Sequence, residues 1–350
     1  MTSILFNRIV ILLVLLTCSG AFQCLAQLPE IRYGQKVPLS VRQIYDKGLD
    51  YLAKIQLKTG GWPSGGGGQT GPGLDGICVM AFLASGSDPN FGQYASTIHR
   101  GLQNIIRTQN ASTGFMGNSM YHHGFGMLAL AEAYGIVHEA NLWKEGKDDG
   151  SRSIGKALEL AVRAAITSQN QNPHKAWRYS PRANDADTSV AGAVLMGLLA
   201  ARNAGIEVPD KTIDAALNYF KAMTSPKGNV GYSGGVGGFG DSLARSSIAT
   251  LVFAIARQKE KDNYKSTANY LKKNLENQGN SGWPFYTRYY QAQAYFQADY
   301  EAWKIWNRRL IREVKAMQGP DGSVRGAAYP TGMSLLALGL NYRFLPIYER

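Results

Sequence analysis

Two carboxyl side chains, Asp185 and Asp187, stand two residues apart directly before an apolar segment in the middle of the chain. Carboxyl groups held close together can share a proton, which raises the pKa of one of them enough to keep it protonated as an acid. A carboxylate in this place can also accept backbone N–H groups as the N-cap of the following helix. The two roles are compatible, so Asp187 and Asp185 are the candidate catalytic carboxyls.

Two adjacent histidines, His122 and His123, open another apolar segment. Consecutive helix positions point about 100° apart, and no His, Asp or Glu lies four residues further on to complete a ligand pair. We therefore predict no metal site and no cofactor. The candidate general base is one of the two, His123 or alternatively His122, with Tyr289 or Arg178 as a partner on the opposite wall. A helix-start histidine bonded to loop backbone is the alternative.

Aromatic and arginine side chains gather before other apolar segments. Aromatic rings can stack on sugar faces, hold an apolar chain or stabilise a carbocation, although they can also simply pack. Neighbouring guanidinium groups favour an elongated ligand with anionic character. The candidate ligand-binding residues are His122, Trp177, Arg178, Tyr179, Trp283, Tyr286, Tyr289, Arg325 and Tyr329.

A repeat positions these residues. Six times along the chain, an apolar residue is followed seven positions later by a polar one, usually Gln, as in Leu49 to Gln56 and Ile311 to Gln318. A glycine with an aromatic residue comes shortly after in four repeats, at Gly61-Trp62, Gly114-Phe115, Gly231-Tyr232 and Gly282-Trp283. Such self-similarity is typical of a protein built from one repeated structural unit.

Each repeat predicts two helices of different character. The segment before each Gln is amphipathic, with apolar residues at helical spacing. The segment after each loop is apolar on every face, as in residues 190–204, which is typical of a buried helix. Six hairpins of this kind can bury all their apolar faces by closing into a ring, with an open superhelix as the competing arrangement. We expect an all-α (α/α)6 toroid with the loops and candidate residues at one mouth.

The first repeat, Gln56-Leu-Lys-Thr-Gly60-Gly61-Trp62, and the last, Gln318 to Val324, resemble the Gln-Trp motif of squalene and oxidosqualene cyclases. The resemblance covers nearly all of the chain after residue 26, and Val324 stands where Trp is expected. It implies the α/α toroid of terpene cyclases and protein prenyltransferases. Cyclases of that family protonate their substrate through an Asp-x-Asp-Asp motif, which Asp185-Ala186-Asp187-Thr188 matches incompletely. The prenyltransferase zinc ligands have no match, because Cys78 stands at the wrong offset from Asp75.

Three functions follow as hypotheses. The first is a toroid that binds an elongated apolar or anionic ligand, an isoprenoid, lipid or acidic glycan, in an aromatic-lined cavity without a complete acid motif. The second is a cyclase-like enzyme with Asp187 as the proton donor. The third is a glycan lyase or hydrolase on the same scaffold. One fold can host many different activities, so the resemblance in fold does not choose among these three functions.

The first residues predict export. Residues 1–26 combine an early Arg8, the apolar run from Ile9 to Leu16 and a small-residue end, which is typical of a secretory signal peptide. One toroid domain would then span residues 27–350. A lipid anchor at Cys18 or Cys24 is the less favoured reading. The net charge of +12 favours anionic partners over neutral ones, but export argues against nucleic acid, no later segment predicts a membrane span, and the oligomeric state is open.

Overall fold

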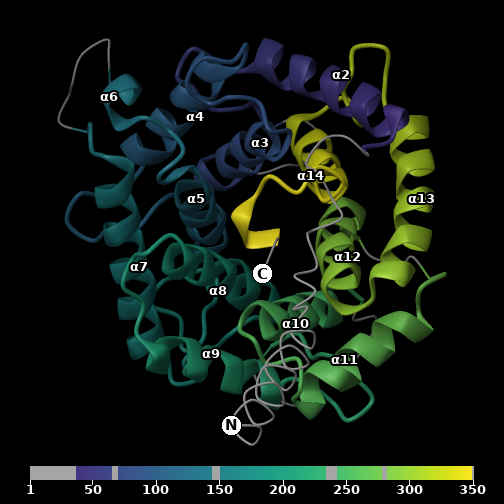
Figure 1. The fold of residues 1–350 in the computed structure, drawn as a ribbon. Coiled ribbons are helices and arrows are strands. Elements are labelled where there is room, and N and C mark those ends of the chain that lie inside the picture. The colour runs from purple at the N-terminus through teal and green to yellow at the C-terminus, as the bar shows by residue number, and fades with distance from the viewer. Residues whose placement is uncertain (1–36, 65–69, 144–149, 234–242, 278–281, 349–350) are drawn as a thin grey trace, which may run out of the picture. The chain divides into compact units, whose positions relative to one another are not determined.

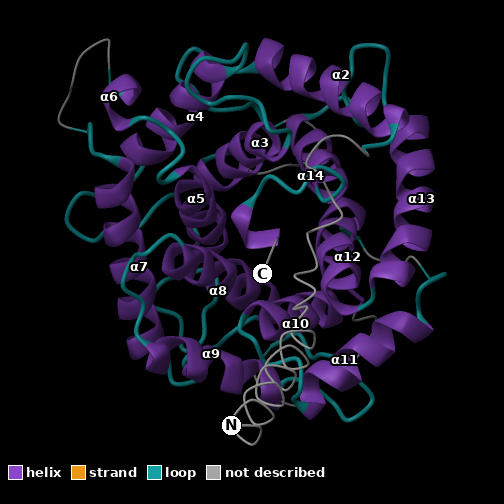
Figure 2. Cartoon of the chain, in the orientation of Figure 1, coloured by secondary structure: helices purple, strands orange, loops and turns teal. Residues whose placement is uncertain are grey.

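The computed structural model describes residues 37–64, 70–143, 150–233, 243–277 and 282–348. Figure 2 shows these residues as helices joined by loops. The expected signal peptide and residues 27–36 lie outside the described residues. None of the described helices combines the length and the apolar character needed to cross a bilayer.

Among the described helices, six form an inner ring, and Figure 1 shows their arrangement. They are α3 (Pro72–Ala84), α5 (Met120–Ala133), α8 (Thr188–Asn203), α10 (Leu243–Ile255), α12 (Pro284–Ala298) and α14 (Ala328–Gly339). Each one contacts the next in chain order, and α14 returns to contact α3. Every residue of α3 is buried, as expected for a helix that is apolar on all faces. The prediction of a closed toroid is confirmed.

Six further helices of the described ranges are amphipathic and surround this ring. They are α2 (Leu39–Ile55), α4 (Ala95–Arg107), α7 (Ile154–Gln171), α9 (Asp210–Ala222), α11 (Asp262–Lys273) and α13 (Tyr300–Met317). In α4 the buried stripe includes Ile98, Leu102, Ile105 and Ile106, one turn apart, while Arg100 and Arg107 face solvent. A short helix, α6 (Glu139–Leu142), interrupts the connection between α5 and α7.

The repeated glutamines join neighbouring outer helices. Each donates one hydrogen bond to its own loop and a second to a carbonyl near the start of the next outer helix. Gln56 Nε2 donates to Gly60 O (2.8 Å) and to Thr97 O of α4 (2.9 Å). Gln109 and Gln169 repeat this pattern toward α7 and α9. Gln318 donates to Gly322 O (3.0 Å) and to Ile44 O of α2 (2.9 Å), which closes the ring.

Beside each of these joints, one loop residue has a positive φ, the left-handed backbone conformation. It is a glycine in repeats one, two, four and six, at Gly60, Gly114, Gly228 and Gly322. A Cβ at any of them would collide with a carbonyl of the next outer helix, such as Lys47 O for Gly322. Repeat three places Lys175 at positive φ instead. These glycines let one outer helix approach the loop before it.

The structure corrects the sequence alignment of two loops. Two residues after each left-handed position lies a fully buried apolar side chain: Trp62, Met116, Trp177, Val230 and Val324. Val230 rather than Tyr232 is thus the counterpart of Trp62 in repeat four, and Met116 rather than Phe115 in repeat two. Tyr232 is therefore not part of the core, and its side chain is 38% exposed.

The chain's own last described residues occupy the ring at the C-terminal ends of the inner helices. The 3-10 helix η1 (Pro346–Tyr348) contacts α8, and Ile347 N donates to Glu132 Oε2 of α5 (3.4 Å). Leu345 and Ile347 are both buried. Figure 1 shows this segment in the middle of the ring. The opposite mouth, at the starts of the inner helices, carries the predicted loops.

Replacing Gln318 by Ala removes both hydrogen bonds at the joint between the last and first repeats. We expect the free energy of unfolding to fall by about 1–3 kcal/mol, because two carbonyls lose their shared donor. Urea unfolding followed by circular dichroism measures it. Gln171→Ala, at an exposed glutamine, is the control, and an equal shift in both variants would contradict the role of Gln318.

Repeat four carries Thr224 in place of the glutamine, and its Oγ1 donates back to Phe220 O (2.7 Å). By the register of the other joints, a glutamine there reaches Gly228 O and Asn263 O. We expect Thr224→Gln to raise the free energy of unfolding by about 0.5–1.5 kcal/mol. Thr224→Glu has nearly the same shape without the N–H donor, so equal stability of the two variants would refute the register.

Candidate functional site

Three backbone segments meet at the start of α8 and build the mouth around Asp187. Asp187 N donates to Trp177 O (2.9 Å), and Thr188 N donates to Tyr232 O (2.9 Å). The Thr188 hydroxyl also donates to Gly231 O (2.8 Å). The loops of repeats three and four are therefore fastened to α8. Thr188 stands where the resemblance implies a second acid, and it acts here as a loop clamp.

The Asp187 carboxyl is held by backbone groups and by one side chain. Oδ1 accepts hydrogen bonds from Ser189 N (2.7 Å) and Val190 N (3.0 Å), so Asp187 is the N-cap of α8. The residue is fully buried, and the Tyr232 phenol hydrogen-bonds to its carboxyl. Burial first and then this hydrogen bond raise the pKa of Tyr232.

Arg178 lies against the two exposed tyrosines of the mouth. Its guanidinium carbon is 5.8 Å from the ring centre of Tyr179 and 5.5 Å from that of Tyr232, within the range of cation–π contacts. Nη1 approaches Asp185 Oδ2 at 3.4 Å, yet this buried nitrogen makes no hydrogen bond of good geometry to a described residue. Tyr179 is held in place because Met120 N donates to its carbonyl (2.8 Å).

Behind Asp187, tyrosine rings from three inner helices pack together. The Tyr286 ring centre is 4.9 Å from that of Tyr290 and 6.1 Å from that of Tyr121. Tyr121 shares a hydrogen bond with Tyr329 of α14. Burial raises the pKa of Tyr121, Tyr286 and Tyr290 well above the usual phenol value, and Asp187 adds to the rise at Tyr286. At neutral pH these phenols are therefore protonated hydrogen-bond donors.

His123 faces away from this cluster, toward the outer helix α7. Its Nδ1 accepts from Met116 N (3.1 Å), so Nε2 carries the hydrogen and donates to Ala161 O (3.0 Å). Burial lowers the pKa of His123 to about 4. Tyr289 instead packs on Phe125 inside the ring, so the predicted pair of His123 and Tyr289 is not brought together.

Asp75 holds the equivalent position in repeat one. Its Oδ1 accepts from Trp62 N (2.9 Å) and its Oδ2 accepts from Asn104 Nδ2 (2.8 Å). Burial outweighs these bonds and raises its pKa to about 6. Thr331 accepts from Val324 N in repeat six (2.8 Å). A polar group on the inner helix thus anchors each of these loops, and His123 and Asp75 share this structural task.

The other predicted residues are divided between interior and surface. His122 lies against Gly71 and Gly73 at the start of α3, where burial lowers its pKa. Trp177 is fully buried, and its indole donates to Ala165 O (2.9 Å), so it lies beneath the mouth rather than in it. Trp283 is largely exposed at the N-cap of α12, and Arg325 is exposed at positive φ.

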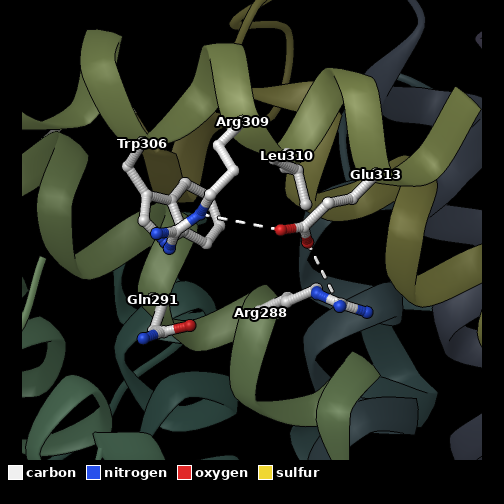
Figure 3. Close-up of a pocket in the computed structure, with 6 residues that line it drawn as sticks. All are labelled: Arg288, Gln291, Trp306, Arg309, Leu310 and Glu313. Atoms are coloured by element: carbon white, nitrogen blue, oxygen red, sulfur yellow. Dashed lines mark ion pairs between the residues drawn. The ribbon is translucent and has the colours of Figure 1, made fainter. Parts of the chain in front are cut away.

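Arg288, which precedes Tyr289 in the sequence, lies on the side of α12 that faces α13. Figure 3 shows it pointing to α13, where its Nη2 pairs with Glu313 Oε2 (3.1 Å). Arg309 Nε approaches Glu313 Oε1 at 3.6 Å. The space between them and Gln291 is about 10 Å³, too little for an organic ligand. This cluster fastens α12 to α13.

The structure adds Tyr232, Tyr121 and Ser189 to the predicted residues. Tyr232 could have been found from its distance to Gly228, since the buried apolar side chain lies two positions after the glycine. Within the described part of the chain, no group of three His, Cys, Asp or Glu side chains could hold a metal ion.

Comparison with known proteins supports the fold alone. No protein-family model matches the sequence, and no curated protein matches it. The alpha-1,6-mannanase GH76A of Salegentibacter sp. HEL1_6, solved as an inactive variant with alpha-1,6-mannotriose, is similar with a TM-score of 0.62 at 8% identity, over 85% of this chain and 98% of that chain. The type II terpene cyclase MstE from Scytonema, solved as a variant with geranylgeranyl dihydroxybenzoate, has a TM-score of 0.59 at 14% identity, over 87% and 98%.

The depressed pKa of His123 predicts a pH dependence of stability. Its unfolded pKa is near 6.5 and its folded pKa about 4, so its contribution is present above pH 6.5 and is lost as the pH falls toward 4. We expect wild type to lose about 2–3 kcal/mol more than His123→Gln between pH 7.5 and pH 4.5 in urea unfolding.

The pKa of Asp75 is raised in the folded state, so its contribution to stability increases as the pH falls, opposite to that of His123. Wild type and His123→Gln both contain Asp75, so its contribution cancels in the difference between them. His174→Gln, at an exposed histidine, is the control. Parallel pH profiles for wild type and His123→Gln would show that His123 is not buried in its neutral form.

Proposed function

We propose that the chain is an exported ligand-binding toroid that holds its ligand at the mouth formed by Asp187, Arg178, Tyr179 and Tyr232. The signal-like residues 1–26 support export. The observation that carries the proposal is the pair of exposed rings of Tyr179 and Tyr232, which lie on either side of the Arg178 guanidinium. Exposed aromatic rings beside a guanidinium offer a ligand both stacking faces and hydrogen-bond donors.

Binding without turnover fits the surroundings of the Asp187 carboxyl better than catalysis. Asp185, the second carboxyl of the motif, is largely exposed and faces Arg178. Thr188 is bonded to Gly231 O and supplies no second acid. The toroids of the mannanase and the terpene cyclase were each solved with an organic ligand, which supports a ligand for this ring as well.

A test uses the two ligand classes that those toroids bind. Purified protein is titrated with alpha-1,6-mannotriose and with geranylgeranyl dihydroxybenzoate in a calorimeter, and other oligosaccharides and isoprenoids follow. We expect a ligand from one class to bind, and Tyr179→Ala or Tyr232→Ala to weaken it at least tenfold, because each removes a ring of the mouth.

Tyr134→Ala is the matched control, since Tyr134 is a similarly exposed tyrosine at the opposite end of α5. If no ligand of either class binds, or if the mouth variants bind as tightly as Tyr134→Ala, the proposal is overturned.

A second candidate function is proton transfer to an isoprenoid by Asp187. It is favoured by the position of Asp187 beside the Tyr286 phenol, with the rings of Tyr121 and Tyr290 behind it, because π-faces stabilise carbocations. Incubation with squalene and with geranylgeranyl dihydroxybenzoate, followed by mass spectrometry, tests it. A cyclised product that Asp187→Asn no longer forms would support it, and the absence of product would end it.

A further inference from the structure

A groove of about 430 Å³ lies between the outer helix α7 and the connection from α8 to α9. Val162, which is buried, and Ile166 and Ile206, which are half-buried, give it an apolar lining. Its volume is within the range of pockets that hold an organic group. The groove is distant in the chain from the tyrosines of the mouth, so its occupant is a separate question.

The equivalent place in repeat two can be identified from the shared glutamines. Gln109 and Gln169 make the same two hydrogen bonds, which fixes the register of α4 against α7. Five lining residues of the groove therefore have counterparts counted back from Gln109. At this place α4 has His99, Leu102, Gln103, Ile106 and Arg107, where α7 has Glu159, Val162, Arg163, Ile166 and Thr167.

In repeat two this place is occupied by the chain itself, through α6 and Trp143. Gln103 Nε2 donates to Leu142 O, and the guanidinium carbon of Arg107 lies 4.9 Å from the ring centre of Trp143. The indole Nε1 of Trp143 donates to Arg152 O (2.8 Å), just before α7. Leu142 is fully buried and Trp143 is buried as well. One helical turn with an aliphatic and an aromatic side chain thus covers this face of α4.

Repeat three has only a short connection at the same place. Residues 134–153 join α5 to α7, whereas residues 204–209 join α8 to α9. The effect is seen in two equivalent side chains, since Ile106 is fully buried and Ile166 is half-buried. The face of α7 therefore keeps the apolar character of a face that a helical turn covers in the neighbouring repeat.

The charges at the groove differ in sign from those in repeat two. Counted back from the carbonyls that accept from the two glutamines, Glu207 stands where repeat two has Arg152. Thr167 stands where repeat two has Arg107, and α6 itself carries an acidic residue, Glu139. Two arginines and an acidic segment in repeat two thus correspond to an acidic rim in repeat three. Charge complementarity there favours a basic segment.

We propose that the groove docks a short helical segment of a partner protein. The segment places an aliphatic side chain and the aromatic one after it against Val162 and Ile166, and a basic side chain toward Glu207. Arg163 takes the place of Gln103 and donates to a backbone carbonyl of the segment. This is recognition of a helix by its apolar face in a groove, and it does not depend on a ligand at the mouth.

The probe is a fluorescein-labelled peptide of residues 137–143 that carries Glu139→Lys, titrated with the full chain and followed by fluorescence anisotropy. We expect it to bind at millimolar concentration or below. Replacing Leu142 and Trp143 of the peptide by Ser is expected to weaken binding at least tenfold, because buried apolar and aromatic anchors supply most of the binding energy.

Ile166→Arg places a charge in the groove and is expected to weaken binding of the same peptide at least tenfold. Ile305→Arg is the matched control, since Ile305 is an exposed isoleucine on another outer helix, α13. Thermal unfolding of both variants checks that the fold is retained. Equal binding by the two variants would show that the peptide does not occupy the groove, and would overturn the proposal.

A charge reversal tests the acidic rim. Wild type is expected to bind the peptide with Glu139→Lys at least threefold more tightly than the peptide with Glu139, and Glu207→Lys is expected to invert this preference. Glu301→Lys, at an exposed glutamate of α13, is the control and keeps the wild-type preference. An unchanged preference in Glu207→Lys would contradict the predicted basic partner.

The remaining results also decide the matter. If no peptide binds at millimolar concentration, the groove does not dock such a segment. If the apolar dye anilinonaphthalene sulfonate binds in a manner that Ile166→Arg abolishes while no peptide binds, the groove is a small-molecule site and the partner segment is refuted.

Discussion

The architecture depends on a joint that is repeated around the ring, a glutamine amide shared between its own loop and the backbone of the next outer helix. Each amide nitrogen has two hydrogens, and the structure uses both, at Gln56, Gln109, Gln169 and Gln318. A left-handed residue beside the joint lets the next helix come within contact distance. The last of these joints reaches the first helix, so every repeat has two neighbours.

Closure determines where the loops of the repeats meet. Because outer and inner helices alternate, all inner helices begin at one mouth, and at their C-terminal ends the ring holds the segment with Leu345 and Ile347. Loops fastened to the starts of inner helices then carry Tyr179 and Tyr232 over Asp187. The fold thus brings together residues more than fifty positions apart in the chain. It also places the Tyr232 phenol on the buried Asp187 carboxyl and Arg178 Nη1 beside Asp185 Oδ2.

The sequence predicted the layers of the fold but not the roles of single side chains. Helical periodicity distinguishes the amphipathic outer helices from the apolar inner ones, because this pattern is contained within each helix. It says nothing of which face a particular inner residue presents, so His123 and Trp177 were assigned to the mouth although they hold loop backbone and an outer helix carbonyl. The sequence pattern also does not determine the register of the loops. The repeat pattern aligns Tyr232 with Trp62 because both follow a glycine, while the conformation at Gly228 makes Val230 the buried residue.

Hydrogen exchange along a denaturant series tests the closed ring most directly. Repeats in an open array contact only their chain neighbours, so the terminal ones lose protection first. In a ring the first and last hairpins are joined to each other. Amides of α3 and α14 are therefore expected to become exposed at the same urea concentration as those of α8. Loss of protection in α3 and α14 well before α8 would show that the two ends of the ring are not joined.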